Sequence, residues 1–400
     1  MEWKEVRLGD VCSELSDGLH KAPKFVKNGE YIFVNAKNLY NGYILDNDPT
    51  KKTSIEEYLK YNKPLGKHTI LYSIDGTIGN IAKYRGEKCV LGKGACYLNC
   101  NPDIVESSYI YYQLQSPHFK SYIHLMSTGS TIKHISLKTM RDYCFELPNL
   151  TDQHRIASIL SSLDRKIELN NKINAELEEM AQAIFKNWFV DFEPFKDGKF
   201  VESELGMIPE GWKVGTLTEI ASYMNGLAMQ KFPPENKRDS LPVLKIKELG
   251  QGFCGTDSDR CSRNIKDECK IHNGDVIFSW SGTLLVDVWC GGDCGLNQHL
   301  FKVTSNDYPK WFYYYWTKHH LQEFIHIAKD KAVTMGHIKR GHLEEALVAI
   351  PDDDSMEKAH QLFEPILSKM ISLRLENSHL SLLRDTLLPR LMSGEIEIPE

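Results

Sequence analysis

The run Thr69-Ile70-Leu71-Tyr72-Ser73, with Gly76-Thr77 soon after it, has a counterpart in the second half of the chain, Asp275-Val276-Ile277-Phe278-Ser279 with Gly282-Thr283. Both runs are rich in β-branched and aromatic residues and end near a glycine, which is typical of a short strand that leads into a turn. A strand and turn that occur twice indicate an internal repeat, and such a repeat determines the fold class before any other signal.

The repeat extends in both directions from this strand and keeps its order. The offset between matching residues is 209 at the start (Trp3 to Trp212) and 203 at the end (Leu147 to Ile350), and it stays between 202 and 210 throughout. The other matching segments are Leu8–Val11 with Leu217–Ile220, Asp17–Leu19 with Asn225–Leu227, Lys37–Leu39 with Lys247–Leu249, Tyr109–Tyr112 with Trp311–Tyr314, and Thr131, His134 and Ile135 with Thr334, His337 and Ile338. This order predicts two similar globular domains of mixed α/β (α+β) structure, related by a pseudo-two-fold internal repeat.

A long helical pattern follows each repeat. Residues 152–189 contain neither proline nor glycine, and their apolar residues and asparagines recur at alternating steps of four and three, which is a heptad seam with Thr151 or Asp152 as its N-cap. The pattern returns between Phe363 and Leu391. The seam positions expected to form the helix pair are Ile156, Leu160, Leu163, Ile167, Asn170, Asn174, Leu177 and Ile184 in the first helix and Met370, Leu373, Asn377, Leu380 and Leu387 in the second.

Asparagine in the seam predicts that the two helices pair specifically with each other, because a buried amide costs stability but fixes the register. Antiparallel pairing would make the helices a coiled-coil spacer that separates the two domains. A helix of about 38 residues spans roughly 57 Å, which exceeds one DNA turn of about 34–36 Å. The alternative is an ordinary helical hairpin inside one large domain.

These signals divide the 400 residues of the chain into five parts. They are domain 1 at 1–150, a central spacer helix at 151–190, a linker at 191–209, domain 2 at 210–352, and a C-terminal spacer helix with its tail at 353–400.

The composition is that of a globular protein, with 42% hydrophobic and 26% charged residues. No apolar run approaches the ~18–20 residues that cross a bilayer, and the first residues lack the pattern of a secretion signal, so we expect a cytoplasmic protein without membrane contact. The net charge is −6, whereas proteins that coat DNA are usually basic. Any contact with nucleic acid would therefore come from local basic patches or from a partner.

Catalytic motifs are missing from the chain. The segment from Gly86 to Gly94 is one residue too long for a phosphate-binding loop and has glycine where a hydroxyl is required. Neither an H-E-x-x-H helix nor a G-x-S-x-G turn occurs, and the acidic run Asp352–Asp354 indicates a solvated face. The ten cysteines include no C-x-x-C pair, which favours reduced thiols over zinc. We therefore expect no catalytic residue, metal or cofactor in this chain.

The segments Gln153–Ile173, Ala183–Phe192 and Leu383–Glu395, with Trp3-Lys4 and Gly211-Trp212-Lys213 opening the repeats, resemble the specificity (S) subunits of type I restriction–modification systems. The resemblance covers essentially the whole chain. It implies two target-recognition domains, each reading one half of a split site in double-stranded DNA. It also implies that the helices form an antiparallel coiled-coil spacer and dock two methyltransferase (modification) subunits. Those subunits would bind S-adenosylmethionine, and restriction subunits using ATP and magnesium would join them for cleavage.

Three pairs of segments are candidates for DNA contact, because base readout needs donors and acceptors aimed at base edges while cations on phosphates fix the position. The first pair resembles a recurrent loop of these domains and contains Gly129, Ser130, Thr131, Lys133 and His134, with Lys331, Thr334, His337 and Lys339. The second contains Ser73, Gly76, Thr77, Lys93 and Gly94, with Ser279, Gly282, Thr283, Gln298 and His299. The third contains Lys37 and Asn38, with Lys247 and Glu248. For each, the alternative is a solvated turn, and His134 and His337 could instead satisfy a local backbone turn.

Two other functions stay open. A self-contained DNA-modifying enzyme predicts methyl transfer or nicking by the chain alone, and the missing motifs argue against it. A coiled-coil adaptor without DNA readout predicts no DNA binding even with partners, and the duplicated domains argue against it.

Overall fold

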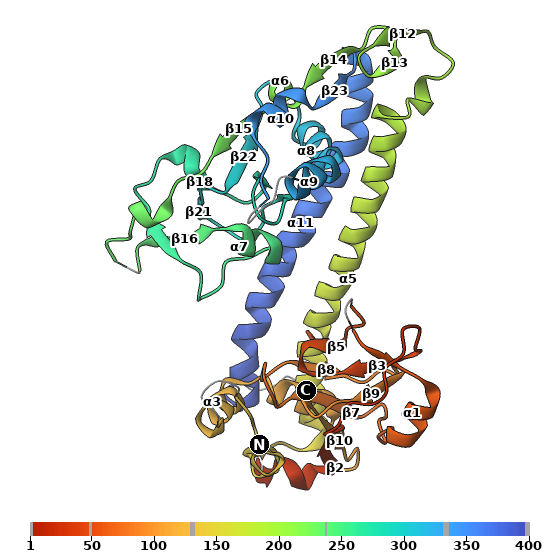
Figure 1. Cartoon of the computed structure of the whole chain (residues 1–400). Helices are drawn as coiled ribbons and strands as arrows, with labels where there is room; N and C mark the ends of the chain where they lie inside the picture. The colour runs from red at the N-terminus through yellow and green to blue at the C-terminus, as the bar shows by residue number, and fades with distance from the viewer. Residues whose placement is uncertain (1–2, 48–49, 129–132, 237, 331–335, 397–400) are drawn as a thin grey trace. The chain divides into compact units, whose positions relative to one another are not determined.

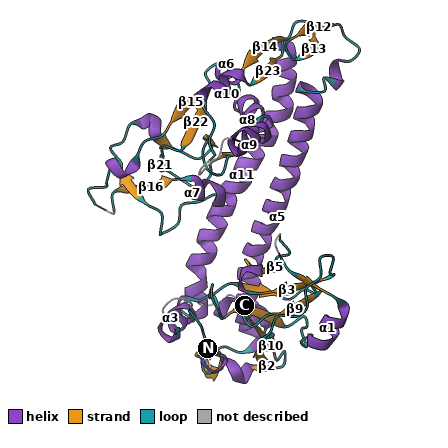
Figure 2. Ribbon diagram, in the orientation of Figure 1, coloured by secondary structure: helices purple, strands orange, loops and turns teal. Residues whose placement is uncertain are grey.

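The structure, a computed structural model, describes residues 3–47, 50–128, 133–236, 238–330 and 336–396 (Figures 1 and 2). Contacts between residues divide the chain into two compact units. Unit 1 consists of Met1–Lys166 and Leu380–Glu400, and unit 2 of Ile167–His379. Each unit combines sheets with helices, so the expected class of two mixed domains is confirmed. The boundaries between the two units, after Lys166 and after His379, lie inside the two long helices. The domain boundaries suggested by the sequence lie instead at the ends of those helices.

Unit 1 is built around a four-stranded antiparallel sheet of order β2-β10-β7-β8, beside a three-stranded sheet β6-β3-β9 in which β3 and β9 run parallel. Two further strand pairs, β1-β11 and β4-β5, complete it. The elements are β1 (Lys4–Arg7), η1 (Leu8–Val11), β2 (Cys12–Asp17), β3 (Tyr31–Val34), η2 (Ala36–Asn38), β4 (Leu39–Tyr40), β5 (Tyr43–Ile44), β6 (Lys52–Thr53), α1 (Ile55–Tyr61), β7 (Thr69–Ser73), β8 (Ile81–Lys83), β9 (Cys89–Leu91), β10 (Ala95–Cys100), α2 (Ser107–Gln113), α3 (Pro117–Met126), α4 (Leu137–Arg141) and β11 (Cys144–Leu147).

Unit 2 repeats this plan. Its sheet β15-β22-β19-β20 matches β2-β10-β7-β8, the parallel pair β16-β21 matches β3-β9, and β14-β23 matches β1-β11. The elements are η3 (Glu193–Phe195), β12 (Phe200–Ser203), β13 (Gly206–Pro209), β14 (Lys213–Thr216), α6 (Leu217–Ile220), β15 (Ser222–Asn225), η4 (Met229–Lys231), β16 (Ser240–Leu244), α7 (Ile246–Gln251), β17 (Arg260–Ser262), η5 (Asp267–Cys269), β18 (Lys270–Ile271), β19 (Val276–Ser279), β20 (Leu285–Val288), β21 (Cys294–Leu296), β22 (Leu300–Thr304), α8 (Lys310–His319), α9 (Leu321–Asp330), α10 (Arg340–Glu345) and β23 (Leu347–Ile350). The hairpin β12-β13 occupies the segment expected to be a linker.

The repeated sequence motifs occupy positions that this plan constrains. Strands β7 and β19 are buried along their whole length, which explains why their apolar runs are continuous. A Cβ on Gly18 would lie 2.2 Å from the carbonyl oxygen of Leu91, and one on Gly226 would lie 2.2 Å from that of Leu296. Only glycine allows the chain to approach the neighbouring backbone so closely at these two places.

The two long helices are α5 (Leu150–Phe189) and α11 (Asp353–Met392), and α11 continues through both Pro365 and Pro389. The N-cap of α5 is Asn149, whose Oδ1 accepts a hydrogen bond from the Asp152 amide at 3.0 Å. The expectation that Thr151 or Asp152 caps this helix was therefore wrong, because the helix begins earlier and both residues lie inside its first turn.

The helices run antiparallel where they meet within each unit. In unit 2, Asn170 Nδ2 donates to Asn377 Oδ1 at 2.9 Å, and the Phe185 ring lies 6.2 Å from the Phe363 ring, so residue numbers rise along α5 as they fall along α11. In unit 1, Arg384 donates to Asp164 Oδ1 at 2.9 Å.

The seam positions named above are all buried or half-buried. The asparagines among them differ in how their amides are satisfied. Asn170 is fully buried, and its Nδ2 reaches both Glu376 and Asn377 at 2.9 Å. Asn174 is also buried, but neither of its amide atoms has a hydrogen-bond partner in the part of the chain that the structure describes. The polar layer of the helix pair therefore rests on Asn170 and Asn377.

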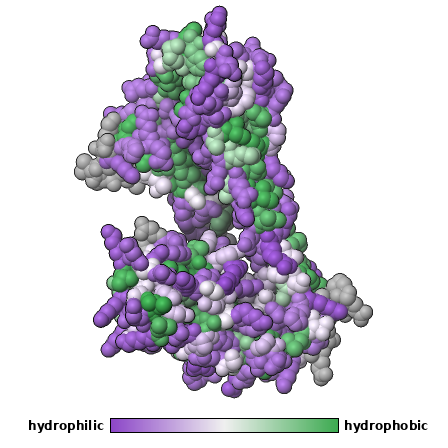
Figure 3. Space-filling view, turned by 90° about the vertical axis from the view of Figure 1, so that its right-hand side faces the viewer, coloured by the Kyte–Doolittle hydropathy of each residue, from purple (hydrophilic) through white to green (hydrophobic). Residues whose placement is uncertain are grey.

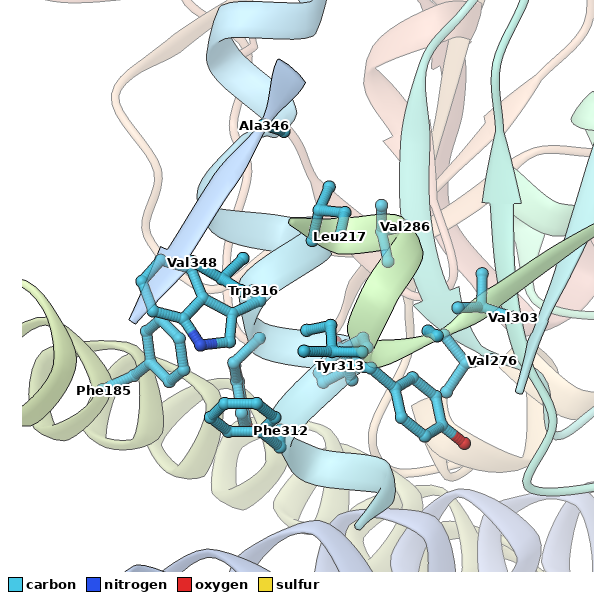
Figure 4. Close-up of a cluster of buried hydrophobic side chains, with 14 of the residues drawn as sticks. Phe185, Leu217, Val276, Val286, Val303, Phe312, Tyr313, Trp316, Ala346 and Val348 are labelled. Carbon is cyan, nitrogen blue, oxygen red and sulfur yellow. The ribbon is translucent and has the colours of Figure 1, made fainter. Parts of the chain in front are cut away.

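Each unit closes its apolar core with pieces of both long helices. The unit 1 core contains Ile156 and Leu160 of α5 together with Leu388, Leu391 and Met392 of α11. In unit 2, Phe185 of α5 packs edge to face on Trp316 of α8, with ring centroids 5.1 Å apart, next to Phe312 and Tyr313 (Figure 4).

Side-chain hydrogen bonds also join the long helices to the rest of each unit. In unit 1, Tyr112 donates to Asp164 Oδ2 at 2.6 Å, and burial followed by the charge of Asp164 raises the pKa of this phenol, so it stays protonated. In unit 2, Arg374 of α11 donates to Asp287 Oδ1 at 2.7 Å. The helices are thus integral parts of both units.

The visible surface of the molecule is mostly hydrophilic, with scattered apolar patches (Figure 3). Both long helices carry exposed large apolar side chains, namely Leu169, Met180, Leu362, Leu382 and Leu383. Within the described residues, no helix combines the length and apolar character needed to cross a bilayer.

Candidate nucleic-acid interface

The first two candidate segments of unit 1 meet in one loop cluster. The turn after β7 lies against the end of the segment that precedes α4. The Gly76 amide donates to the Lys133 carbonyl at 3.1 Å, and the Ile135 amide donates to the Ile74 carbonyl at 2.9 Å. Lys93 joins them from the turn between β9 and β10, where the Ile74 amide donates to the Gly94 carbonyl at 3.1 Å. Segments far apart in sequence thus form a single surface, called here the unit 1 loop cluster.

Unit 2 builds the same frame from its own residues. The Gly282 amide donates to the Gly336 carbonyl at 2.9 Å, and the Ile338 amide donates to the Trp280 carbonyl at 3.1 Å. Isolated bridges pair Asp75 with His134 in unit 1 and Ser281 with His337 in unit 2. These residues, with Gln298 and His299 from the turn before β22, form the unit 2 loop cluster.

The strand-end serines hold the turns in both clusters and do not reach the surface. Ser73 and Ser279 are fully buried. Ser73 Oγ accepts from the Asn80 amide at 2.8 Å, whereas Ser279 Oγ donates to the Thr283 carbonyl at 2.8 Å. Gly76 and Gly282 have positive φ angles, +71° and +65°, which favour glycine at the exposed tip of each turn.

Charged side chains dominate the unit 1 loop cluster. Asp75 lies at its centre, with Lys93 Nζ 3.9 Å from one carboxylate oxygen and His134 Nδ1 3.9 Å from the other. Lys133, Lys93 and Thr77 are exposed. The cluster therefore offers ammonium and hydroxyl donors to a polyanion such as DNA.

Neutral polar side chains and rings dominate the unit 2 loop cluster. Ser281 Oγ lies 3.1 Å from His299 Nδ1, and Gln298 Nε2 lies 3.3 Å from His299 Nε2. The Trp280 ring centroid lies 6.0 Å from that of His299 and 6.3 Å from that of His337. This cluster offers amide and imidazole groups that can discriminate base edges.

The third pair of candidate segments divides into exposed and buried residues. Lys37 and Lys247 are exposed, and Lys247 pairs with Asp257 at 2.7 Å. Asn38 is only 3% exposed, and its amide donates to the Leu45 carbonyl and to Thr50 Oγ1. Glu248 is equally buried and accepts from Ser258 Oγ at 3.0 Å. The structure thus places Asn38 and Glu248 inside the fold, away from the surface that base contact would require.

Lys339 does not occupy the place in unit 2 that Lys133 occupies in unit 1. Lys339 is the N-cap of α10, as Ser136 is of α4, so the residue opposite Lys133 in the frame of unit 2 is Gly336. The sequence did not single out Asp75, Trp280 or Ser281, although they lie between the matched serines and glycines. Gly129, Ser130, Thr131, Lys331 and Thr334 lie outside the described residues.

No group of three or more metal-ligating side chains occurs in the described ranges. The arrangement that the structure does bring together is a pair of exposed loop clusters on equivalent backbone frames, suited to binding.

The chain is similar to known specificity subunits of type I restriction enzymes. A family model described as the type I restriction modification DNA specificity domain matches residues 1–179 and again residues 209–377. The type I restriction enzyme MjaIX specificity subunit of Methanocaldococcus jannaschii is 30% identical and covers 94% of this chain and 86% of its own. The HindI specificity subunit of Haemophilus influenzae is 22% identical and covers 99% of this chain and 100% of its own.

A solved structure extends the likeness to the fold. The S subunit of a type I restriction–modification system from M. genitalium superposes with a TM-score of 0.55 at 18% identity, over 100% of this chain and 97% of that one. The chain therefore belongs to the family of type I restriction–modification DNA specificity subunits, as a non-catalytic member that carries the specificity domain twice.

Proposed function

We propose that each unit reads one half of a bipartite site in double-stranded DNA, and that α5 and α11 set the gap between the halves. The observation that carries this proposal is the loop frame that occurs once in each unit, with the same backbone hydrogen bonds and different exposed side chains. Two frames of one design with different side chains suit the reading of two different short sequences.

The negative net charge of the chain is consistent with a DNA-binding protein that needs partner subunits for tight binding. The net charge of −6 gives little general attraction for DNA, so local cations such as Lys133 would contact phosphates and position the DNA backbone. We propose that two methyltransferase subunits add the remaining contacts and bind S-adenosylmethionine, and that restriction subunits using ATP and magnesium join them. The complex would act in the cytoplasm, where the ten free thiols of this chain are expected to stay reduced.

The exposed apolar side chains of the long helices support docking of those partners. Leu382 is 67% exposed and Leu383 47% exposed on α11, and Leu169 is 52% exposed on α5. Leu382 and Leu383 are neighbours in sequence, and exposed apolar side chains next to one another favour a protein interface. We propose that the methyltransferase subunits cover these helix faces.

The experiment that tests the proposal is co-expression of the chain with the methyltransferase encoded beside it, followed by mapping of methylated adenines across the host genome. We expect one bipartite motif, with two short specified halves and a fixed unspecified gap. Deleting one heptad from each helix should shorten the spacer by about 10 Å and change the gap by about three base pairs, while both half-sites stay the same.

Three results would contradict the proposal. Methylation of the same sites without this chain would favour the adaptor function. An uninterrupted motif would mean that the units do not read separate half-sites, and methyl transfer by the purified chain alone would favour the self-contained enzyme.

A further inference from the structure

Lys93 in unit 1 and Gln298 in unit 2 occupy the same position of the backbone but have different side chains. The residue before it, Gly92 or Asn297, donates its amide to the Val34 carbonyl at 2.8 Å or to the Leu244 carbonyl at 3.1 Å. The chain then turns back, and the first residue of the next strand, Ala95 or Leu300, donates its amide to the carbonyl of the same Gly92 or Asn297 at 3.0 Å in both units. Lys93 follows Gly92, and Gln298 follows Asn297, so the two side chains leave equivalent turns.

The hydrogen bonds around Gln298 leave part of its amide free. An amide nitrogen can only donate, so the contact between Gln298 Nε2 and His299 Nε2 at 3.3 Å makes that ring nitrogen the acceptor. The proton of His299 then lies on Nδ1 and is donated to Ser281 Oγ at 3.1 Å. One amide hydrogen of Gln298 is thereby held, and its Oε1 and second amide hydrogen make no other hydrogen bond within the described residues.

A half-buried glutamine held in this way has the donor and acceptor that adenine requires. In the major groove adenine presents the N7 acceptor beside the N6 amino donor, and an amide side chain pairs with both atoms at once. The ring of His299 and the hydroxyl of Ser281 fix the amide plane, so less rotamer freedom is lost when the base binds.

Lys93 in unit 1 has a different support and different chemistry. Asp75 stands where Ser281 stands in unit 2, and its carboxylate lies 3.9 Å from Lys93 Nζ, while Gly94 provides no side chain in place of His299. The Lys93 side chain is 47% exposed. An ammonium group is a pure donor, and in the major groove guanine presents two adjacent acceptors, N7 and O6.

We propose that this one position determines a base in each half-site, with Lys93 reading a guanine and Gln298 reading an adenine through the major groove. The inference rests on the proposed function, since it assigns residues to the two half-sites that the units would read. Asp75, Ser281 and His299 are positioning residues, which orient the reader without contacting the base.

The test exchanges the two readers in the complex with the methyltransferase. The motif of each variant is mapped in the genome as for the natural chain. Lys93→Gln should change one guanine to adenine in one half-site only, and Gln298→Lys should change one adenine to guanine in the other half-site only. Discrimination at the affected base pair should change by about tenfold or more. Matched controls are Lys120→Gln on α3 and Gln322→Lys on α9, both exposed and outside the loop clusters, and both should leave the motif unchanged.

A second measurement uses the natural chain, so it does not depend on how the variants fold. Oligonucleotides carry 7-deazaadenine or 7-deazaguanine at single positions of the mapped site, which removes the N7 acceptor. Methylation of the site by the complex should fall about tenfold when the substituted base is one particular guanine of one half-site or one particular adenine of the other.

The outcomes separate the inference from the proposed function. Both exchange variants could retain the natural bipartite motif while all 7-deaza substrates are methylated equally. This result would overturn the inference and leave the proposed function standing. A uniform loss of affinity in Lys93→Gln with an unchanged motif would place Lys93 on a phosphate and also overturn it. If the natural chain produces no bipartite motif, the proposed function itself fails.

Discussion

The unit 1 loop cluster carries charge where the unit 2 loop cluster carries neutral polar groups and rings. Asp75 and Lys93 occupy the places of Ser281 and Gln298. The backbone bonds beneath them are nevertheless the same, at 3.1 and 2.9 Å for the glycine amides and 2.9 and 3.1 Å for the isoleucine amides. The difference teaches that buried serines and constrained glycines maintain the frame. The exposed positions can therefore change chemistry without changing the fold.

The largest effect is expected from disturbing the backbone next to the frame, where Gly18 packs on Leu91 and Gly92 in unit 1 and Gly226 packs on Leu296 and Asn297 in unit 2. An alanine at Gly18 or Gly226 would place its Cβ 2.2 Å from a backbone carbonyl oxygen, so the strand turn must shift. Gly18→Ala and Gly226→Ala should each lower the free energy of unfolding by about 1–3 kcal/mol, and by similar amounts, because the close approach is the same in both units. Urea denaturation monitored by circular dichroism measures this.

Glycines in open space provide the controls. A Cβ on Gly66 in unit 1 or Gly341 in unit 2 meets no atom within 4 Å. Alanine there should change stability by less than about 0.5 kcal/mol, or raise it slightly in the helix that contains Gly341. Equal stability of all four variants would show that the glycine contacts do not maintain the frame.

A smaller effect is expected from removing cations. Lys133→Ala and Lys339→Ala should each weaken DNA binding and reduce the salt slope of the binding constant by about 0.9 if the ammonium group contacts a phosphate. That change corresponds to about a threefold difference in relative affinity between 50 and 200 mM salt. Fluorescence anisotropy of the complex with its methyltransferase on labelled DNA measures both quantities.

Lys213→Ala on β14 is the control, since this exposed lysine lies outside both loop clusters. Unchanged affinity and slope in Lys133→Ala would remove that lysine from the interface and would weaken the contrast between a cationic and a neutral cluster.

The smallest effect is expected from the central residues of the clusters. Asp75→Asn removes the carboxylate that lies 3.9 Å from both Lys93 and His134, so the cations of unit 1 attract any DNA more strongly. Binding to DNA without the target site should tighten by about twofold, because an exposed ion pair is worth less than about 1 kcal/mol. Ser281→Ala in unit 2 removes no charge and should leave non-specific binding unchanged. Weaker non-specific binding in Asp75→Asn would show that the carboxylate does not oppose DNA.

The repeat, the two domains and the helix pair were predictable because the residues that reveal them are those that the fold constrains. Gly18 and Gly226 are fixed by close backbone approach, and the seam positions by burial between helices. The buried roles of Asn38 and Glu248 were not predictable, because a polar residue beside a lysine has the same local pattern whether it faces solvent or a buried hydroxyl. Asp75 and Ser281 gave no signal, because their partners come from distant turns.

The shared use of the long helices has a consequence for the order in which the protein matures during translation. The core of unit 1 includes Leu388, Leu391 and Met392, and a Cβ on Gly394 would lie 3.1 Å from the ring of Trp3. Unit 2 is a continuous segment, whereas unit 1 is complete only after the segment that starts at Leu380 has been synthesised. The domain that is made first is therefore finished last, and a message truncated before residue 380 would produce a complete unit 2 joined to a unit 1 whose apolar core stays open to chaperones and proteases.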